Sequence, residues 1–115
     1  MTLKSPPIIM FVFSSKVFLI FLIKELIVNS KSSISLQKHN HRTEYWTVTS
    51  GKPKITINKR NFFSKENDTV FIPRGAVHRI ENLLKKPVKI MEAQTGKILK
   101  ESDIIRYKDI YGRIN

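Results

Sequence analysis

The sequence predicts an all-β protein, either a barrel or a sandwich. From Lys24 onward, short stretches rich in Ile, Val, Phe and Tyr follow one another, and several end at turn residues such as Gly51 or Gly96. Short strands separated this regularly by turn residues are typical of barrels and sandwiches. At 115 residues the chain is long enough for one domain with a single hydrophobic core.

The expected strands can be given in chain order, and most are bounded by turn signals. They are KELIV, ISLQKHNH, EYWTVTS, PKITIN, a strand within NFFSKENDT, VFIP, HRIEN and VKIMEAQ. A tight turn is expected at Arg42-Thr43, between the second and third of these. In the tail SDIIRYKDIYGR, Ser102 is a candidate N-cap with Asp103 in the first turn, which predicts a short C-terminal helical turn.

Residues 1–23 are expected to be an atypical apolar extension before the domain formed by residues 24–115. The apolar run IIMFVFSSKVFLIFLI is interrupted at Ser14, Ser15 and Lys16, and its unbroken part is shorter than the about 20 residues that cross a bilayer. No small-residue cleavage site of a signal peptide follows. We therefore expect strands or a disordered extension here, with a signal or anchor as the alternative, and no membrane partner.

The amino-acid composition limits which metal ligands and which binding partners are expected. There is no cysteine, which excludes disulfides and thiolate metal sites, so any metal is bound by nitrogen and oxygen. The formal net charge is +12, but the lysines are spread along the chain and no nucleic-acid motif accompanies them. We expect attraction of a small phosphate ester and no nucleic-acid partner.

The histidines predict a metal site. Side chains at alternate positions of a strand share a face, so Gln37, His39 and His41 point the same way. Glu44 lies on the next strand, and the third histidine, His78, follows a Pro-x-Gly turn. Imidazole nitrogens together with a carboxylate suit zinc, manganese, cobalt, nickel or iron.

Two stretches resemble the paired signature of the cupin superfamily. The first cupin motif is His-x-His, a short spacer, Glu and a later Gly, matched by His39, His41, Glu44 and Gly51. The second is Pro-x-Gly-x-x-His-x-x-x-Asn, matched by Pro73, Gly75, His78 and Asn82. Asn67 stands where a Gly is expected and tolerates the same left-handed backbone. The resemblance implies a cupin jelly-roll barrel and the metal ligands His39, His41, Glu44 and His78.

The longer stretches SLQKHNHRTEYWTVTSGKPKITI, VFIPRGAVHRIEN and DIIRYKDIYGR are similar to type II mannose-6-phosphate isomerases. That family also forms the C-terminal domain of bifunctional mannose-1-phosphate guanylyltransferase/mannose-6-phosphate isomerase enzymes. The short spacer between His41 and Glu44 is typical of it. The guanylyltransferase domain is not expected in this sequence, and residues 1–23 do not resemble the family's N-terminal stretch.

The resemblance implies interconversion of mannose 6-phosphate and fructose 6-phosphate, in the synthesis of GDP-mannose and polysaccharide precursors. It further implies a cytoplasmic protein, one divalent metal ion (zinc, manganese or cobalt), a sugar-phosphate substrate and a homodimer. The isomerisation needs a Lewis acid, a base and a cationic seat for the phosphate.

The sequence itself offers candidates for the base and for the cations that bind the phosphate. Glu92 shares a strand face with Val88 and Ile90, and burial of that face would raise the pKa of Glu92 towards a value useful for proton transfer. Gln37 lies on the ligand face and is a second candidate catalytic residue. The candidate phosphate contacts are Arg42, Arg79, Lys97 and Arg106.

Two other functions fit part of this pattern. A truncated cupin without turnover would act as a sugar-binding or regulatory module, which the atypical residues 1–23 favour. A metal-dependent oxygenase would use a similar ligand set, but the YWTVTSG stretch and the C-terminal tail favour the mannose-phosphate family.

Overall fold

The structure, a computed structural model, describes residues 3–4, 9–12, 20–96 and 104–107, with side chains from residue 22 onward. Every regular element in these ranges is a strand, which confirms the all-β prediction. The strands are β1 (Leu3–Lys4), β2 (Ile9–Val12), β3 (Ile20–Val28), β4 (Ser32–Ser33), β5 (Leu36–Lys38), β6 (Arg42–Ser50), β7 (Lys54–Ile57), β8 (Arg60–Phe63), β9 (Thr69–Ile72), β10 (His78–Asn82), β11 (Val88–Gly96) and β12 (Ile105–Tyr107).

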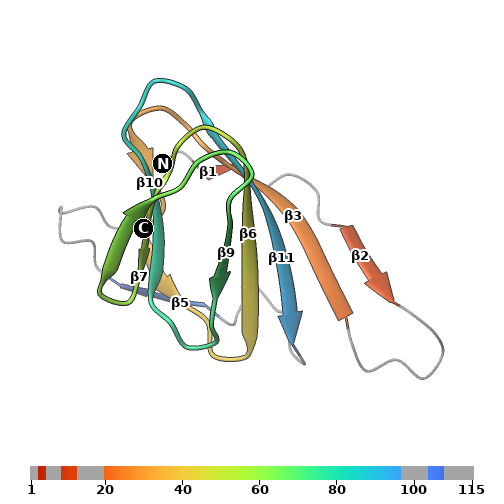
Figure 1. The fold of residues 1–115 in the computed structure, drawn as a ribbon. Coiled ribbons are helices and arrows are strands. Elements are labelled where there is room, and N and C mark those ends of the chain that lie inside the picture. The colour runs from red at the N-terminus through yellow and green to blue at the C-terminus, as the bar shows by residue number, and fades with distance from the viewer. Residues whose placement is uncertain (1–2, 5–8, 13–19, 97–103, 108–115) are drawn as a thin grey trace.

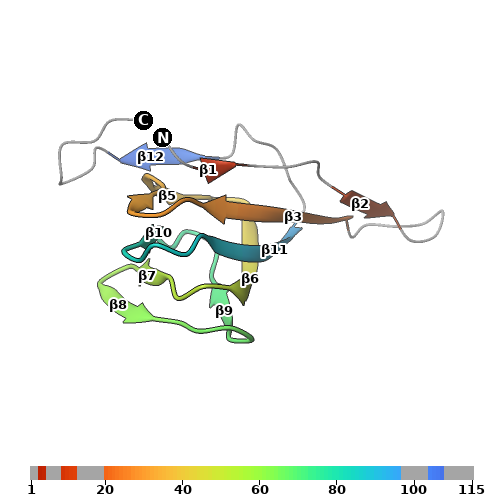
Figure 2. The ribbon, with the colours of Figure 1, turned by 90° about the horizontal axis from the view of Figure 1, so that it is seen from above.

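The strands form two antiparallel sheets that face each other. One has the order β1-β3-β11-β6-β9, with β2 beside β3, and the other has the order β12-β5-β10-β7-β8, with β4 beside β10. Figure 2 shows β3, β11, β6 and β9 along one side of the molecule and β5, β10, β7 and β8 along the other. The buried apolar side chains of both sheets form one core between them.

Alternation along the strands decides what lies between the sheets. On β6, the buried side chains are Arg42, Glu44, Trp46 and Val48, and on β11 they are Val88, Ile90, Glu92 and Gln94. The inward rows are therefore apolar at one end of the sandwich and polar at the other. The apolar end supplies the core, and the polar end supplies the candidate site.

The bend before β6 differs from the sequence prediction. The prediction of a turn at Arg42-Thr43 is wrong: the bend lies at residues 40–41, and β6 already begins at Arg42. The physical reason is that Arg42 is buried and donates from Nε to Glu44 Oε2 at 2.8 Å, so it belongs to the inward row of the strand. Next to the bend, Gly75 N donates to His39 O at 2.8 Å.

Near both ends of the chain, the structure can be compared with the sequence predictions. Residues 20–23 belong to β3, so the expected domain boundary after residue 23 falls inside a strand. In the C-terminal tail, residues 105–107 form β12 and not the expected helical turn, while Ser102 and Asp103 lie outside the described residues. None of the described residues forms a helix long and apolar enough to cross a membrane.

Candidate metal centre

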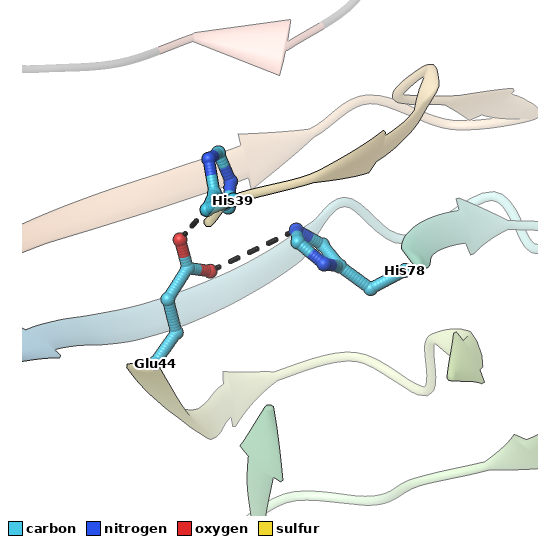
Figure 3. Close-up of side chains that lie close together, drawn as sticks. All are labelled: His39, Glu44 and His78. Atoms are coloured by element: carbon cyan, nitrogen blue, oxygen red, sulfur yellow. Dashed lines mark ion pairs between the residues drawn. The ribbon is translucent and has the colours of Figure 1, made fainter. Parts of the chain in front are cut away.

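Three side chains from separate elements converge at the polar end of the sandwich (Figure 3). They are His39, which follows β5, Glu44 on β6 and His78 at the start of β10, and their ligand atoms all lie within 4.8 Å of one another. His39 Nε2 is 3.2 Å from Glu44 Oε2, and His78 Nε2 is 4.0 Å from Glu44 Oε1. All three residues are buried.

His78 is held in the form that binds metals. Its Nδ1 lies 3.0 Å from Ala76 O, and because a carbonyl only accepts, Nδ1 carries the proton and Nε2 presents a lone pair towards Glu44. Burial lowers the pKa of His78 to about 4, an effect that the Ala76 hydrogen bond opposes and the charges of His39 and Arg42 reinforce. The imidazole is therefore neutral near pH 7, as a metal ligand must be.

A buried arginine lies among these groups. Arg42 Nε donates to Glu44 Oε2 at 2.8 Å, and Arg42 Nη2 lies 3.0 Å from His39 Nε2. Its positive charge partly offsets that of the Glu44 carboxylate. A divalent cation held by Glu44 and His39 would compete with Arg42 for these two side chains. Arg42 Nη1 is buried without a hydrogen-bond partner among the described residues.

The donor set suits a divalent transition metal: two imidazole nitrogens and a carboxylate, all buried, with at least one imidazole oriented by a backbone carbonyl. His41, a ligand in the sequence prediction, has an exposed side chain in the bend and is not part of this cluster. Gln37 is buried and faces the same cavity, and its Nε2 donates to Ser35 Oγ at 3.1 Å.

The cluster opens into a cavity of about 220 Å³. The lining residues are Lys24, Leu26, Ile34, Gln37, His39, Arg42, Glu44, Trp46, His78, Glu92, Ile104 and Arg106.

A second carboxylate, Glu92, faces this cavity from β11. Burial raises its pKa to about 7, and the nearby charge of Glu44 adds to the effect, while Lys24 opposes it. Glu92 Oε1 accepts a hydrogen bond from Trp46 Nε1 at 3.0 Å, and Oε2 accepts one from Gln94 Nε2 at 2.6 Å. The inward face expected for this strand is the one the structure shows.

The four cations expected to bind phosphate are separated by the fold. Arg42 and Arg106 line the cavity, Arg42 buried and Arg106 exposed. Arg79 lies on β10 next to His78, so its side chain points to the opposite face, where Nη2 is 3.8 Å from Glu81 Oε1. Lys97 lies outside the described residues.

Sequence reasoning assigned no site role to Lys24 or Trp46, which both line the cavity. Lys24 lies on β3, where it pairs in register with Glu92, and its Nζ is 3.8 Å from Glu92 Oε2. The inward direction of Lys24 could have been found from the alternation of β3, in which Lys24 shares a face with the buried Leu26 and Val28. This alternation alone does not place Lys24 in the site, because no sequence pattern shows that β3 lies beside β11.

Comparison with solved structures defines the class of fold. The chain superposes on the cupin domain of Cnp3 from Schizosaccharomyces pombe with a TM-score of 0.67 and 18% identity, over 82% of this chain and 64% of that one. It superposes on an oxalate oxidase in complex with glycolate with a TM-score of 0.67 and 16% identity, over 75% and 45% of the two chains. The fold is that of the cupins, as the motifs predicted.

Comparison of sequences identifies the family. The family model described as "Mannose-6-phosphate isomerase C-terminal" matches residues 14–109, and the chain belongs to this family. It is 43% identical over 93 residues to the alginate biosynthesis protein AlgA of Pseudomonas putida, covering 81% of this chain and 19% of AlgA. It is 41% identical over 93 residues to a mannose-1-phosphate guanylyltransferase of Klebsiella pneumoniae, covering 81% and 20%.

A third relative is the xanthan biosynthesis protein XanB of Xanthomonas campestris, 40% identical over 93 residues, or 81% of this chain and 20% of XanB. The chain thus spans about a fifth of the length of these relatives. The family resemblance found in the sequence motifs is confirmed.

Proposed function

We propose that the chain is a metal-dependent isomerase that interconverts mannose 6-phosphate and fructose 6-phosphate. The observation that carries the proposal is the buried convergence of His39, Glu44 and His78 beside Glu92, in a member of the mannose-6-phosphate isomerase C-terminal family. Relatives named for alginate and xanthan biosynthesis share this stretch of sequence, which supports a role in polysaccharide synthesis here.

The metal ligands in this proposal are His39, Glu44 and His78, with Gln37 as the further polar side chain that faces them from β5. A bound divalent ion supplies Lewis acidity, which stabilises negative charge on the substrate's carbonyl and hydroxyl oxygens. His41 remains a prediction from the motif, and its exposed position argues against a direct role.

Glu92 is the proposed base. As a carboxylate it takes the proton from C2 of open-chain mannose 6-phosphate, leaving an enediolate. As a carboxylic acid it returns the proton to C1, while a proton passes from O2 to O1, and the product is fructose 6-phosphate. A pKa raised to about 7 by burial suits both directions, because the group gains and loses a proton near neutral pH. Arg42, Arg106 and Lys24 are the cavity cations proposed to attract the phosphate.

The test is conversion of mannose 6-phosphate to fructose 6-phosphate by the full chain with added zinc, manganese or cobalt. Glu92→Gln should lower kcat by roughly 100-fold or more, since general acid–base catalysis typically contributes 10²–10⁴. Glu66→Gln is the matched control, because Glu66 is an exposed glutamate in the loop between β8 and β9 and does not line the cavity.

Two outcomes would contradict the proposal. Unchanged turnover in Glu92→Gln would remove Glu92 as the base. A folded, metal-loaded protein that binds mannose 6-phosphate without converting it would support the binding-module function instead.

A further inference from the structure

We propose that Trp46 is a positioning residue whose single indole N–H links the metal-ligand carboxylate to the base carboxylate, so that metal binding and proton transfer are coupled. The inference rests on the proposed function, because it takes Glu44 as a ligand and Glu92 as the base. It adds a residue to which the motifs assign no role.

Trp46 contacts three groups of the site at once. Its Nε1 lies 3.0 Å from Glu44 Oε1 and also 3.0 Å from Glu92 Oε1. An indole has one N–H and no acceptor, so one proton is shared between two carboxylates. The ring also meets His78 edge-on, with ring centroids 5.4 Å apart and planes at 78°.

Each of the two carboxylates is fixed separately through its other oxygen. Glu44 Oε2 accepts from Arg42 Nε at 2.8 Å, while Glu92 Oε2 accepts from Gln94 Nε2 at 2.6 Å. The two Oε1 atoms, one from Glu44 and one from Glu92, both accept from the indole N–H of Trp46. In this arrangement Trp46 is the bridge between the half of the site that would hold the metal and the half that would move the proton.

The bridge has a physical consequence. Two buried carboxylates repel each other, and a donor shared between them reduces that repulsion. When a cation draws electron density from Glu44, that carboxylate becomes a weaker acceptor and the indole N–H bonds more strongly to Glu92. Occupancy of the metal site would therefore set the position of Glu92 Oε1.

The alternative is that Trp46 only fills space, since its side chain is 1% exposed and belongs to the hydrophobic core. A filling role needs the ring volume and not the N–H. An experiment that removes the N–H and keeps the ring separates the two roles.

Trp46 is the only tryptophan in the chain, so biosynthetic incorporation of benzothienylalanine replaces its N–H by sulfur at this one place. We expect the protein to fold, with zinc Kd raised and kcat lowered, each by roughly 10- to 100-fold, the usual effect of losing a partner that orients a ligand. KM should stay within about threefold, because the N–H contacts no substrate in this scheme. Trp46→Phe is a second variant with the same expectation.

A readout independent of activity comes from the single indole ¹⁵N–¹H signal of the labelled protein. Zinc titration should move this signal, and in Glu92→Gln the movement should differ, because one of the two acceptors has changed. Glu66→Gln should behave as the parent protein.

The outcomes separate this inference from the proposed function. Unchanged zinc Kd and kcat in the benzothienylalanine protein, or a zinc-induced shift identical in the parent and Glu92→Gln proteins, would overturn the bridge. A zinc-induced shift that depends on Glu92, in a protein without turnover, would support the bridge and overturn the isomerase.

Discussion

At the scale of single residues, the bend at Asn40–His41 decides which histidines reach the site. His39 is buried next to Glu44, whereas His41, two residues later, is exposed. We expect His78→Ala to weaken zinc binding by more than the roughly 10- to 100-fold typical of losing a supporting partner. His41→Ala, a matched loss of one imidazole, should change zinc Kd by less than about threefold. Isothermal titration with zinc measures both.

A large loss of affinity in His41→Ala would contradict the placement of the bend. It would restore the ligand set that the His-x-His motif implies, in which His39 and His41 act together. Retained affinity would instead leave Gln37 as the remaining inward side chain of β5 that faces the cluster.

Arg42 gives a second prediction at this scale. Its guanidinium donates to Glu44 Oε2 and contacts His39 Nε2, so it occupies two of the side chains that would hold a metal. Arg42→Met removes this competitor and leaves the Glu44 charge uncompensated, so zinc should bind more tightly. A charge-assisted hydrogen bond contributes about 1.5–3 kcal/mol, which corresponds to a gain of roughly 10- to 100-fold.

The measurement for Arg42→Met is again zinc titration, with Arg79→Met as the control. Arg79 is also a buried arginine, but it lies on the opposite face of β10. Weaker zinc binding in Arg42→Met alone would show that Arg42 supports the ligands instead of competing for them.

The sequence predicted those parts of the site that depend on alternation within a single strand. Glu44, His78 and Glu92 face inward as their strand patterns indicate. The orientation of Arg79 also follows from alternation with His78, but only once His78 is known to point inward. The contacts of Lys24 and Trp46 with Glu92 depend on β3, β11 and β6 being neighbours, which no local pattern shows.

At the scale of elements, strand existence was predictable and strand parity across a bend was not. The stretches EYWTVTS, VFIP, HRIEN and VKIMEAQ each match a strand. Asn67 has a φ of 76°, the left-handed backbone expected where the motif has a Gly. The bend before β6 was predicted two residues too late because the polarity of Arg42 indicates an exposed turn, whereas its side chain is buried and donates to Glu44, two positions further along the same strand.

The turn after β6 gives a prediction for an element. Gly51 has a φ of +90°, and a Cβ there would lie 2.9 Å from Pro87 O and 3.0 Å from Val88 Cγ2. Gly75 has a similar φ of +83°, but a Cβ there would meet nothing within 4 Å. Gly75→Ala should therefore cost roughly 1–2 kcal/mol of unfolding free energy for backbone strain alone.

Gly51→Ala should cost more than Gly75→Ala by at least about 1 kcal/mol, because it adds overpacking to the same strain. Urea unfolding followed by circular dichroism measures both variants. Equal costs would mean that the turn between β6 and β7 can move away from the start of β11.

At the scale of the whole molecule, one sandwich holds an apolar core at one end and a cluster of buried charges at the other. Arg42, Glu44 and Glu92 occupy the same strands as Val48 and Ile90, so we expect the site and the core to unfold together. Buried charges lower stability unless they are compensated. A ligand that binds only the folded site should therefore stabilise the entire domain.

Zinc at 100 times its Kd should add about 2.7 kcal/mol to the unfolding free energy by mass action. For a domain of about 100 residues this raises Tm by roughly 10 °C or more. Thermal unfolding with zinc and with a chelator measures the shift. In His78→Ala the shift should disappear at the same zinc concentration, because the lost imidazole is one of the three side chains that could hold the metal. An equal shift in His78→Ala would mean that zinc stabilises the protein from a different place, and the cluster at the polar end would no longer be the metal site.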